Sequence, residues 1–349
     1  MAMRFAVIGC GRMGKHHART LQNLESADLV AVVDANEDAA KSLAAQRNCK
    51  AFTSATDVMD DIDAAVIATP TVSHLKAAWP LVEAGKHLII EKPYCDDVAA
   101  GGELIKLAGK SGSKIIIGHS ERFNPACIAM SKYDIRPKFI EAHRISPFTF
   151  RSADIGVVLD MMIHDIDLVL MMARSRVVDV QAIGVSVIGK HEDICNARLR
   201  FASGCVANIT ASRLAIKTER KMRIFSEEHY LSIDYAKKCG LVIEKNQNLD
   251  IIQMARDMDV DDIAELAQSV DYTKLLKFEE LVPDESKDPL TRQAEAFIDM
   301  VTNGAETLAC KVEEGLAAVV TANAIISAIS QHKWDGDAGS RVGSDIISR

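Results

Sequence analysis

The chain has 349 residues, 48% of them apolar and 26% charged, so it can bury at least one large core and is not disordered as a whole. At roughly 100–200 residues per domain, this length predicts two domains. Its 49 acidic side chains outnumber its 41 basic ones, and the formal charge of −8 excludes a global basic field for nucleic acid or an anionic membrane.

Membrane spans and disulfides are not expected. No run approaches the roughly 20 apolar residues of a membrane helix: Val157–Ala173 contains a histidine and three aspartates, and Gly315–Ser330 is short and diluted by polar residues. A strand-like run begins at Arg4, so no signal peptide is expected before it. The eight cysteines are scattered without a CxxC pair, which predicts free thiols in a reducing cytoplasm and no structural metal.

The first 120 residues alternate short apolar runs with helical segments, which indicates βαβ units and a parallel sheet buried on both faces. The expected strands are Arg4–Gly9, Asp28–Asp34, Ala64–Ala68, His87–Ile90 and Lys114–Gly118. The expected helices between them are Lys15–Leu24, Glu37–Gln46, Ser73–Glu83 and Val98–Gly109. We therefore assign residues 1–122 to a Rossmann domain.

The pattern changes after about residue 122 to longer strands with hairpin-like turns, which favours an open, mainly antiparallel sheet. These strands are expected at Phe139–Ser146, Val178–Ile188, Ala197–Phe201, Cys205–Ser212, Arg220–Phe225, Tyr230–Asp234 and Gly240–Glu244, and a helix at Leu159–Ala173. We assign residues 123–335 to this α+β domain, with an irregular insertion at about 245–287, closing helices at about 290–332 and a loose tail at 336–349. The fold class is α/β: a Rossmann domain followed by an α+β domain.

A glycine-rich motif follows the first strand. Gly9, Gly11 and Gly14 form a G-x-G-x-x-G that also contains Arg12 and Met13, it opens a helix, and Asp34 ends the next strand. The glycines permit a tight turn and close approach to a pyrophosphate, which the helix N-terminus attracts. Asp34 is placed to accept from the adenine-ribose hydroxyls and to repel a 2′-phosphate, so the motif predicts NAD.

Four further motifs follow at set intervals: Ala68-Thr69-Pro70-Thr71 with His74, Glu91-Lys92-Pro93, the stretch Gly118–Pro125, and Leu159–Leu168. Together with the glycine motif, this succession resembles the Gfo/Idh/MocA family of oxidoreductases over nearly the whole chain. The resemblance implies oxidation or reduction of one carbinol of a sugar or cyclitol, a cis bond before Pro93, and a homodimer or homotetramer assembled through the second-domain sheet. Within the family, the last two stretches are most similar to enzymes that oxidise C3 of UDP-N-acetylglucosamine and feed a 2,3-diamino sugar into lipid A.

Hydride transfer needs a base for the hydroxyl proton and a group that stabilises charge on the oxygen. Lys92 follows the fourth strand and therefore lies at the carboxyl edge of the sheet, where ligands of such folds bind. His164 stands four residues after Asp160, which places both on one helical face and predicts that the aspartate orients the imidazole. We assign His164 as base and Lys92 as the group that polarises the oxygen, and the inverse assignment stays open.

Other candidates contact ligands less directly. The resemblance implies that Thr69, Pro70, His74 and Glu91 lie along the cofactor, while Arg12 either meets the pyrophosphate or is a solvated surface charge. His119, Glu121 and Arg122 follow the fifth strand at the ligand edge, and Arg122 binds either a substrate phosphate or Glu121. Possible diphosphate contacts in the second domain are Arg144, Arg151 and Arg213.

The sequence thus predicts an NAD-dependent dehydrogenase of a nucleotide-linked amino sugar, with Lys92, His164 and Asp160 as catalytic residues. Two alternatives remain: a dehydrogenase of a free sugar or inositol, which would need no diphosphate contact, and an NAD-sensing regulatory protein without catalysis. The pairing of a base with an orienting carboxylate argues against a sensor, which needs no proton acceptor.

Overall fold

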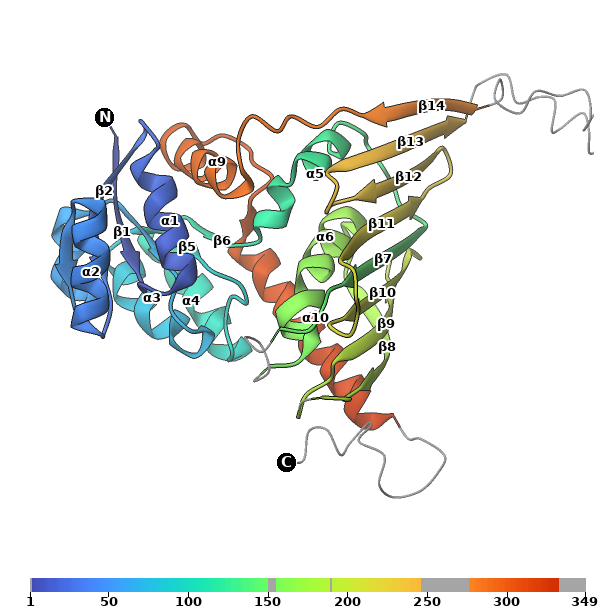
Figure 1. Cartoon of the computed structure of the whole chain (residues 1–349), viewed down its shortest axis with the longest axis horizontal. Coiled ribbons are helices and arrows are strands. Elements are labelled where there is room, and N and C mark those ends of the chain that lie inside the picture. The colour runs from blue at the N-terminus through green and yellow to red at the C-terminus, as the bar shows by residue number, and fades with distance from the viewer. Residues whose placement is uncertain (1, 150–154, 189, 246–275, 333–349) are drawn as a thin grey trace, which may run out of the picture.

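The computed structural model of the chain describes residues 2–149, 155–188, 190–245 and 276–332. They form two sheets, one parallel and one mainly antiparallel, with helices between them (Figure 1). This is the predicted architecture.

The first sheet has seven strands in the order β15-β6-β5-β4-β1-β2-β3. The parallel strands are β1 (Met3–Ile8), β2 (Ala27–Val33), β3 (Lys50–Phe52), β4 (Ala64–Ile67), β5 (His87–Ile90) and β6 (Ile115–Ile117). Their connections contain the α-helices α1 (Arg12–Gln22), α2 (Glu37–Arg47), α3 (His74–Glu83) and α4 (Val98–Ser111), and the 3₁₀ turns η1 (Ala55–Asp61) and η2 (Thr71–Ser73). Strands β4 and β6 are buried at every residue, because helices cover both faces of the sheet.

The second sheet has eight strands in the order β14-β13-β12-β11-β7-β10-β9-β8. Their bounds are β7 (Phe139–Ile145), β8 (Val177–Val185), β9 (Ile194–Phe201), β10 (Val206–Ser212), β11 (Glu219–Phe225), β12 (His229–Asp234), β13 (Cys239–Lys245) and β14 (Leu276–Leu281). Every neighbouring pair is antiparallel except β7 with β10. Burial alternates along β9, so one face of the sheet is in the core and the other is exposed.

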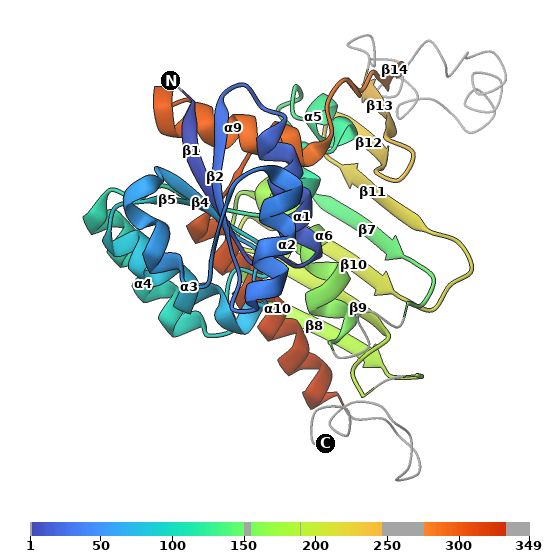
Figure 2. The same ribbon diagram turned by 60° about the vertical axis from the view of Figure 1, so that its left-hand side comes forward.

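Helices on the buried face connect the two halves. The 3₁₀ turn η3 (Ser120–Phe123) and the short α5 (Pro125–Met130) lead into the second domain, and α6 (Ile163–Ala173) lies against the sheet together with α10 (Val312–Gln331) (Figure 2). The helix expected at Leu159–Ala173 is not uniform: Val158–Met162 forms a π-helical turn, η5, before α6 begins. The Glu192 carboxylate accepts from the Val158 N–H at 3.1 Å at the start of this turn, a tertiary contact that spacing along the chain does not reveal.

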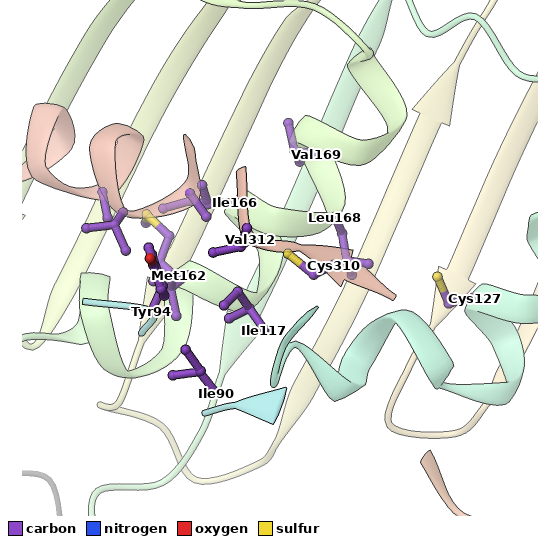
Figure 3. Close-up of a cluster of buried hydrophobic side chains, with 14 of the residues drawn as sticks. Ile90, Tyr94, Ile117, Cys127, Met162, Ile166, Leu168, Val169, Cys310 and Val312 are labelled. Atoms are coloured by element: carbon purple, nitrogen blue, oxygen red, sulfur yellow. The ribbon is translucent and has the colours of Figure 1, made fainter. Parts of the chain in front are cut away.

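The C-terminal segment returns to the first domain. Helix α9 (Pro289–Asn303) packs on α1, and β15 (Cys310–Lys311) pairs antiparallel with β6, before α10 (Val312–Gln331) crosses back to the second sheet. Figure 3 shows the core that results, in which Ile90 and Ile117 of the first sheet meet Val312 of α10 and Met162 and Ile166 of the second domain. One hydrophobic core therefore continues through both domains.

Helix α10 is longer than the sequence suggested. It has 20 residues and a mean hydropathy of 1.5, so by length and composition it is the one described helix able to cross a membrane. The expectation that no run reaches this length is thus wrong, because the helix begins at Val312 rather than Gly315. It packs on α4, α6 and β8, as a core helix does.

Two other expectations fall largely outside the described residues. The insertion at 245–287 was expected to be irregular, but its described part contains β14, a regular strand paired with β13, so the expectation is wrong there. The tail at 336–349 lies entirely outside the described residues. All eight cysteines are free thiols.

Candidate active site

A cleft of about 830 Å³ lies between the two domains, in the size range of small-molecule sites. Nine of the predicted site residues line it: Arg12, Met13, Thr69, Glu91, Lys92, Glu121, Arg144, Asp160 and His164. Further lining residues that the sequence did not single out are Ser120, Asn124, Arg220, Tyr235 and Lys238. The glycine loop and both proposed catalytic side chains therefore face one cavity.

The glycine loop has the geometry that a dinucleotide requires. Gly9 has φ +101°, and a Cβ there would lie 2.6 Å from the Ala68 carbonyl oxygen, while a Cβ on Gly14 would lie 1.8 Å from the Gly9 oxygen. The space in front of Gly11 is open to at least 4 Å, so backbone can approach a phosphate closely there. The Asp34 carboxylate accepts from the Cys10 N–H at 2.7 Å, which ties the loop to the end of β2.

Thr69 also fits a bound cofactor, because its hydroxyl is buried in the cleft wall without a hydrogen-bond partner among the described residues. Such a group normally finds a partner. Pro70 and His74, expected beside it, do not line the cleft. Instead the His74 ring bonds the Thr69 and Pro93 carbonyl oxygens, each at 2.9 Å, and burial lowers its pKa. His74 thus fastens the loops after β4 and β5 to each other.

Lys92 reaches across the cleft to the second domain. Its Nζ donates to the Asp160 carbonyl oxygen at 2.8 Å and lies 3.9 Å from the Asp160 carboxylate. Burial lowers the pKa of Lys92, and the Asp160 carboxylate acts in the opposite direction. The Lys92–Pro93 peptide bond is cis, as the resemblance implied.

Glu91, the residue before this lysine, is hydrogen-bonded to a histidine that the sequence did not single out. His17 of α1 bonds Glu91 through Nε2 at 2.7 Å, and both side chains are buried. Burial opposes the charge on Glu91, but His17 and Lys92 together keep its pKa below the usual value. The pair links the helix that follows the glycine loop to the loop that carries Lys92.

His164 is buried in the cleft wall and is not oriented as predicted. Its Nδ1 has no hydrogen-bond partner among the described residues, and the expected bond from Asp160 is not formed. The π-turn places Asp160 beside Lys92 instead, so the α-helical spacing rule does not apply. Burial, followed by the charges of Lys92 and Arg144, holds the pKa of His164 well below its ordinary value, so the ring is neutral at pH 7.

His119 and Arg122 do not line the cleft, contrary to their prediction as substrate ligands. Arg122 is buried and forms a bidentate pair with Asp167 at 2.6 and 2.8 Å, and it also bonds Glu314 rather than Glu121. His119 lies 3.8 Å from the same Asp167 carboxylate. His119, Asp167 and Cys310 bring possible metal-ligand atoms together, but Arg122 already donates to both carboxylate oxygens of Asp167.

Two of the arginines expected to contact a diphosphate are paired with carboxylates, although Arg144 does line the cleft. Arg144 is buried and bonds both oxygens of Asp165, at 2.7 and 2.9 Å, and the Glu121 carboxylate at 2.9 Å. Arg213 bonds Asp193 at 2.6 Å, and Arg151 lies outside the described residues. Glu121 does line the cleft, but as the partner of Arg144.

The fold and this site define an NAD-dependent oxidoreductase that acts on a CH–OH group. The NAD-binding Rossmann fold of the GFO/IDH/MocA oxidoreductase family matches residues 3–119, and that family's C-terminal domain matches residues 135–232. The chain belongs to the Gfo/Idh/MocA family and is an NAD-dependent sugar dehydrogenase.

Named relatives include a nucleotide-sugar dehydrogenase and inositol dehydrogenases. The chain is 37% identical to the UDP-N-acetylglucosamine 3-dehydrogenase of Acidithiobacillus ferrooxidans over 67% of its own length and 74% of the relative's. A solved structure of that enzyme, GnnA, superposes with a TM-score of 0.81 at 29% identity, covering 94% of this chain and 98% of the other. The inositol 2-dehydrogenase of Rhizobium meliloti is 28% identical over 95% of this chain and 98% of its own.

Proposed function

We propose that the protein oxidises the C3 hydroxyl of UDP-N-acetylglucosamine to the 3-keto sugar with NAD. The observation that carries the proposal is the convergence of Lys92, from the first domain, and His164, from the second, in one cleft with the glycine loop. The similarity to a UDP-N-acetylglucosamine 3-dehydrogenase supports the choice of sugar and carbon.

The two side chains divide the proton chemistry. His164 is neutral at pH 7, so a ring nitrogen can take the hydroxyl proton as base. The Lys92 amine donates to the same oxygen and stabilises the negative charge that develops on it. NAD supplies the hydride acceptor when bound. Asp160 acts through its contacts with Lys92 and holds the amine in place.

A dehydrogenase of a free sugar or inositol is the second candidate, favoured by the inositol 2-dehydrogenase that matches almost the full chain. The same Lys92 and His164 chemistry would serve a cyclitol, so the two candidates differ only in what the rest of the cleft binds. The sensor alternative has no support, because the family is one of oxidoreductases.

The decisive experiment measures NADH formation from NAD with UDP-N-acetylglucosamine, with an aminotransferase added to consume the 3-keto product. The Lys92→Met variant should lose roughly 10²–10⁴-fold in kcat, the range for a lost proton-transfer or charge-stabilising group, while it still binds NADH. Lys76→Met is the matched control, because Lys76 is exposed on α3 and does not line the cleft. Oxidation of inositol without turnover of any UDP-hexosamine would favour the second candidate instead.

We further propose that the enzyme works in the cytoplasm as a homodimer or homotetramer in which a second copy of the chain covers the exposed face of the eight-stranded sheet. No described helix covers that face (Figure 1). Phe225 and Tyr230 form a ring pair on it, with centroids 4.9 Å apart, and Phe225 remains 37% exposed. Light scattering should show a multiple of the chain mass, and Phe225→Asp should reduce it.

A further inference from the structure

The cleft is more basic than the chain that forms it. Five basic and three acidic side chains line it, although the whole chain carries a formal charge of −8. One of the acids, Glu91, is already hydrogen-bonded to His17 at 2.7 Å. A basic cleft in an acidic protein favours an anionic ligand.

Most of these cations are engaged at the reacting end. Lys92 bonds Asp160, and Arg144 is saturated by Asp165 and Glu121. Arg12 is the first residue of α1, directly after the glycine turn, and lines the cleft at the end expected to bind the cofactor. Two basic residues remain as possible contacts for an anionic ligand, Arg220 and Lys238, which line the cleft on the second-domain side.

Arg220 is placed to meet a ligand. The strand register puts it directly opposite Arg144, so both side chains leave the sheet on its buried face. Unlike Arg144, it is exposed and forms no ion pair with any residue in the described ranges. Its charge is nevertheless felt inside the site, because it is among the groups that lower the pKa of His164.

Lys238 lies in the turn between β12 and β13, at the end of the sheet that faces the first domain (Figure 1). Its φ of +52° belongs to the left-handed region, where glycine is favoured, yet a lysine stands there and lines the cleft. Its amine contacts Glu285 at 2.6 Å, but both side chains are exposed, and such pairs are weak enough for a ligand to replace.

We propose that Arg220 and Lys238 form an anion subsite that holds the diphosphate of the substrate, while Lys92 and His164 act on the sugar at the other end of the cleft. This inference rests on the proposed function, since it supplies the contact that separates a nucleotide sugar from a free cyclitol. A guanidinium binds phosphate oxygens through two parallel N–H donors, and a lysine adds a point charge.

The test is calorimetric titration of the NADH-loaded, full-length protein with UDP and, separately, with inorganic pyrophosphate. Arg220→Gln should weaken both at least about tenfold, the typical loss of a charged hydrogen-bonding group, and Lys238→Gln should weaken them less. Arg220→Lys keeps the charge and should recover part of the loss. The control Lys217→Gln removes an exposed charge from the loop before β11 and should stay within about twofold, and NADH affinity should be unchanged in every variant.

Turnover separates this inference from the proposed function. In Arg220→Gln, KM for UDP-N-acetylglucosamine should rise about tenfold with little change in kcat, because the subsite binds ground state and transition state alike. Unchanged KM in an active enzyme overturns the subsite and leaves C3 oxidation standing. If Arg220→Gln loses pyrophosphate binding but the wild type turns over no UDP-hexosamine, the result supports the subsite and refutes C3 oxidation. The subsite is also overturned if the wild type binds neither UDP nor pyrophosphate. A third titration uses glucuronate, a carboxylate without phosphate, and the subsite is overturned if Arg220→Gln weakens the binding of glucuronate alone.

Discussion

Replacing Arg144 by methionine removes the cation that is hydrogen-bonded to two carboxylates, those of Asp165 and Glu121, in the cleft wall. The side chains of Arg144 and Asp165 are 5% and 3% exposed, so the carboxylate left behind cannot recover its hydration. Breaking a buried pair in this way costs about 3–5 kcal/mol. That is a large share of the roughly 5–15 kcal/mol that holds a typical domain folded.

The same sheet offers a matched control, an ion pair between neighbouring strands that is exposed to solvent. Arg223 of β11 pairs with Glu141 of β7 at 2.8 Å, almost the distance of the buried pair, but these side chains are 44% and 31% exposed. Arg223→Met should therefore cost only about 0–1 kcal/mol. Urea unfolding followed by circular dichroism, with equal m-values, measures both changes.

The pH dependence gives a second signature. Burial raises the pKa of Asp165, and Arg144 is the strongest influence against that rise, so the pKa rises further in Arg144→Met. The folded variant then binds a proton more tightly than the unfolded chain does, and its stability increases as the pH falls towards the ordinary range of an aspartate. The loss of unfolding free energy in Arg144→Met, relative to the wild type, should be smaller at about pH 5 than at about pH 8. Equal losses in the two variants, or a stable Arg144→Met that loses only substrate affinity, would show that Arg144 is a ligand-binding rather than a structural residue.

Three further outcomes are expected. Because the pKa of His164 lies well below 6.5, the acid limb of kcat/KM measured at saturating NAD should appear only below pH 6.5, where the ring gains a proton and ceases to be a base. An acid limb with its midpoint above pH 7 would contradict this role. Gly14→Ala places a Cβ 1.8 Å from the Gly9 oxygen and should lower the melting temperature and weaken NADH binding at least about tenfold, whereas Gly102→Ala in α4, with open space at its Cβ, should be neutral or stabilising. Asp34→Ser removes the charge that repels a 2′-phosphate and should raise kcat/KM with NADP about tenfold or more relative to NAD, and an unchanged cofactor preference would place the discrimination elsewhere.

The sequence predicted the parts of the fold that depend on neighbouring residues. Continuous apolar runs mark strands buried on both faces, and the glycine motif with Asp34 specifies a local turn, so the Rossmann strands and the loop geometry followed directly. Strand β3 and the two-residue β15 were missed, because they are too short to carry a periodic pattern. Strand β14 was missed as well, because its residues are mostly exposed and half of them are charged, so they carry no continuous apolar pattern.

Partners of polar side chains were predicted less well, because they depend on contacts between distant segments. Asp160 was assigned to His164 by α-helical spacing, and a π-turn directed it to Lys92. His17 gave no signal, since its partner Glu91 lies 74 residues away. Arg220 was recognisable only in retrospect, through its place opposite Arg144 across two strands.

The return of the C-terminal segment makes the first domain dependent on the end of the chain. Phe297 of α9 packs against Phe5 of β1 with tilted rings whose centroids are 6.1 Å apart, and Gly315 lies so close to Ile117 that a Cβ would approach to 2.3 Å. A protein truncated before Pro289 would expose that surface together with the unpaired edge of β6, and we expect it to aggregate because an open strand edge can pair with other chains. The first domain therefore cannot be exchanged between proteins by itself, and a chimera must include α9 and α10 from the same parent. Both domains should unfold in one cooperative thermal transition.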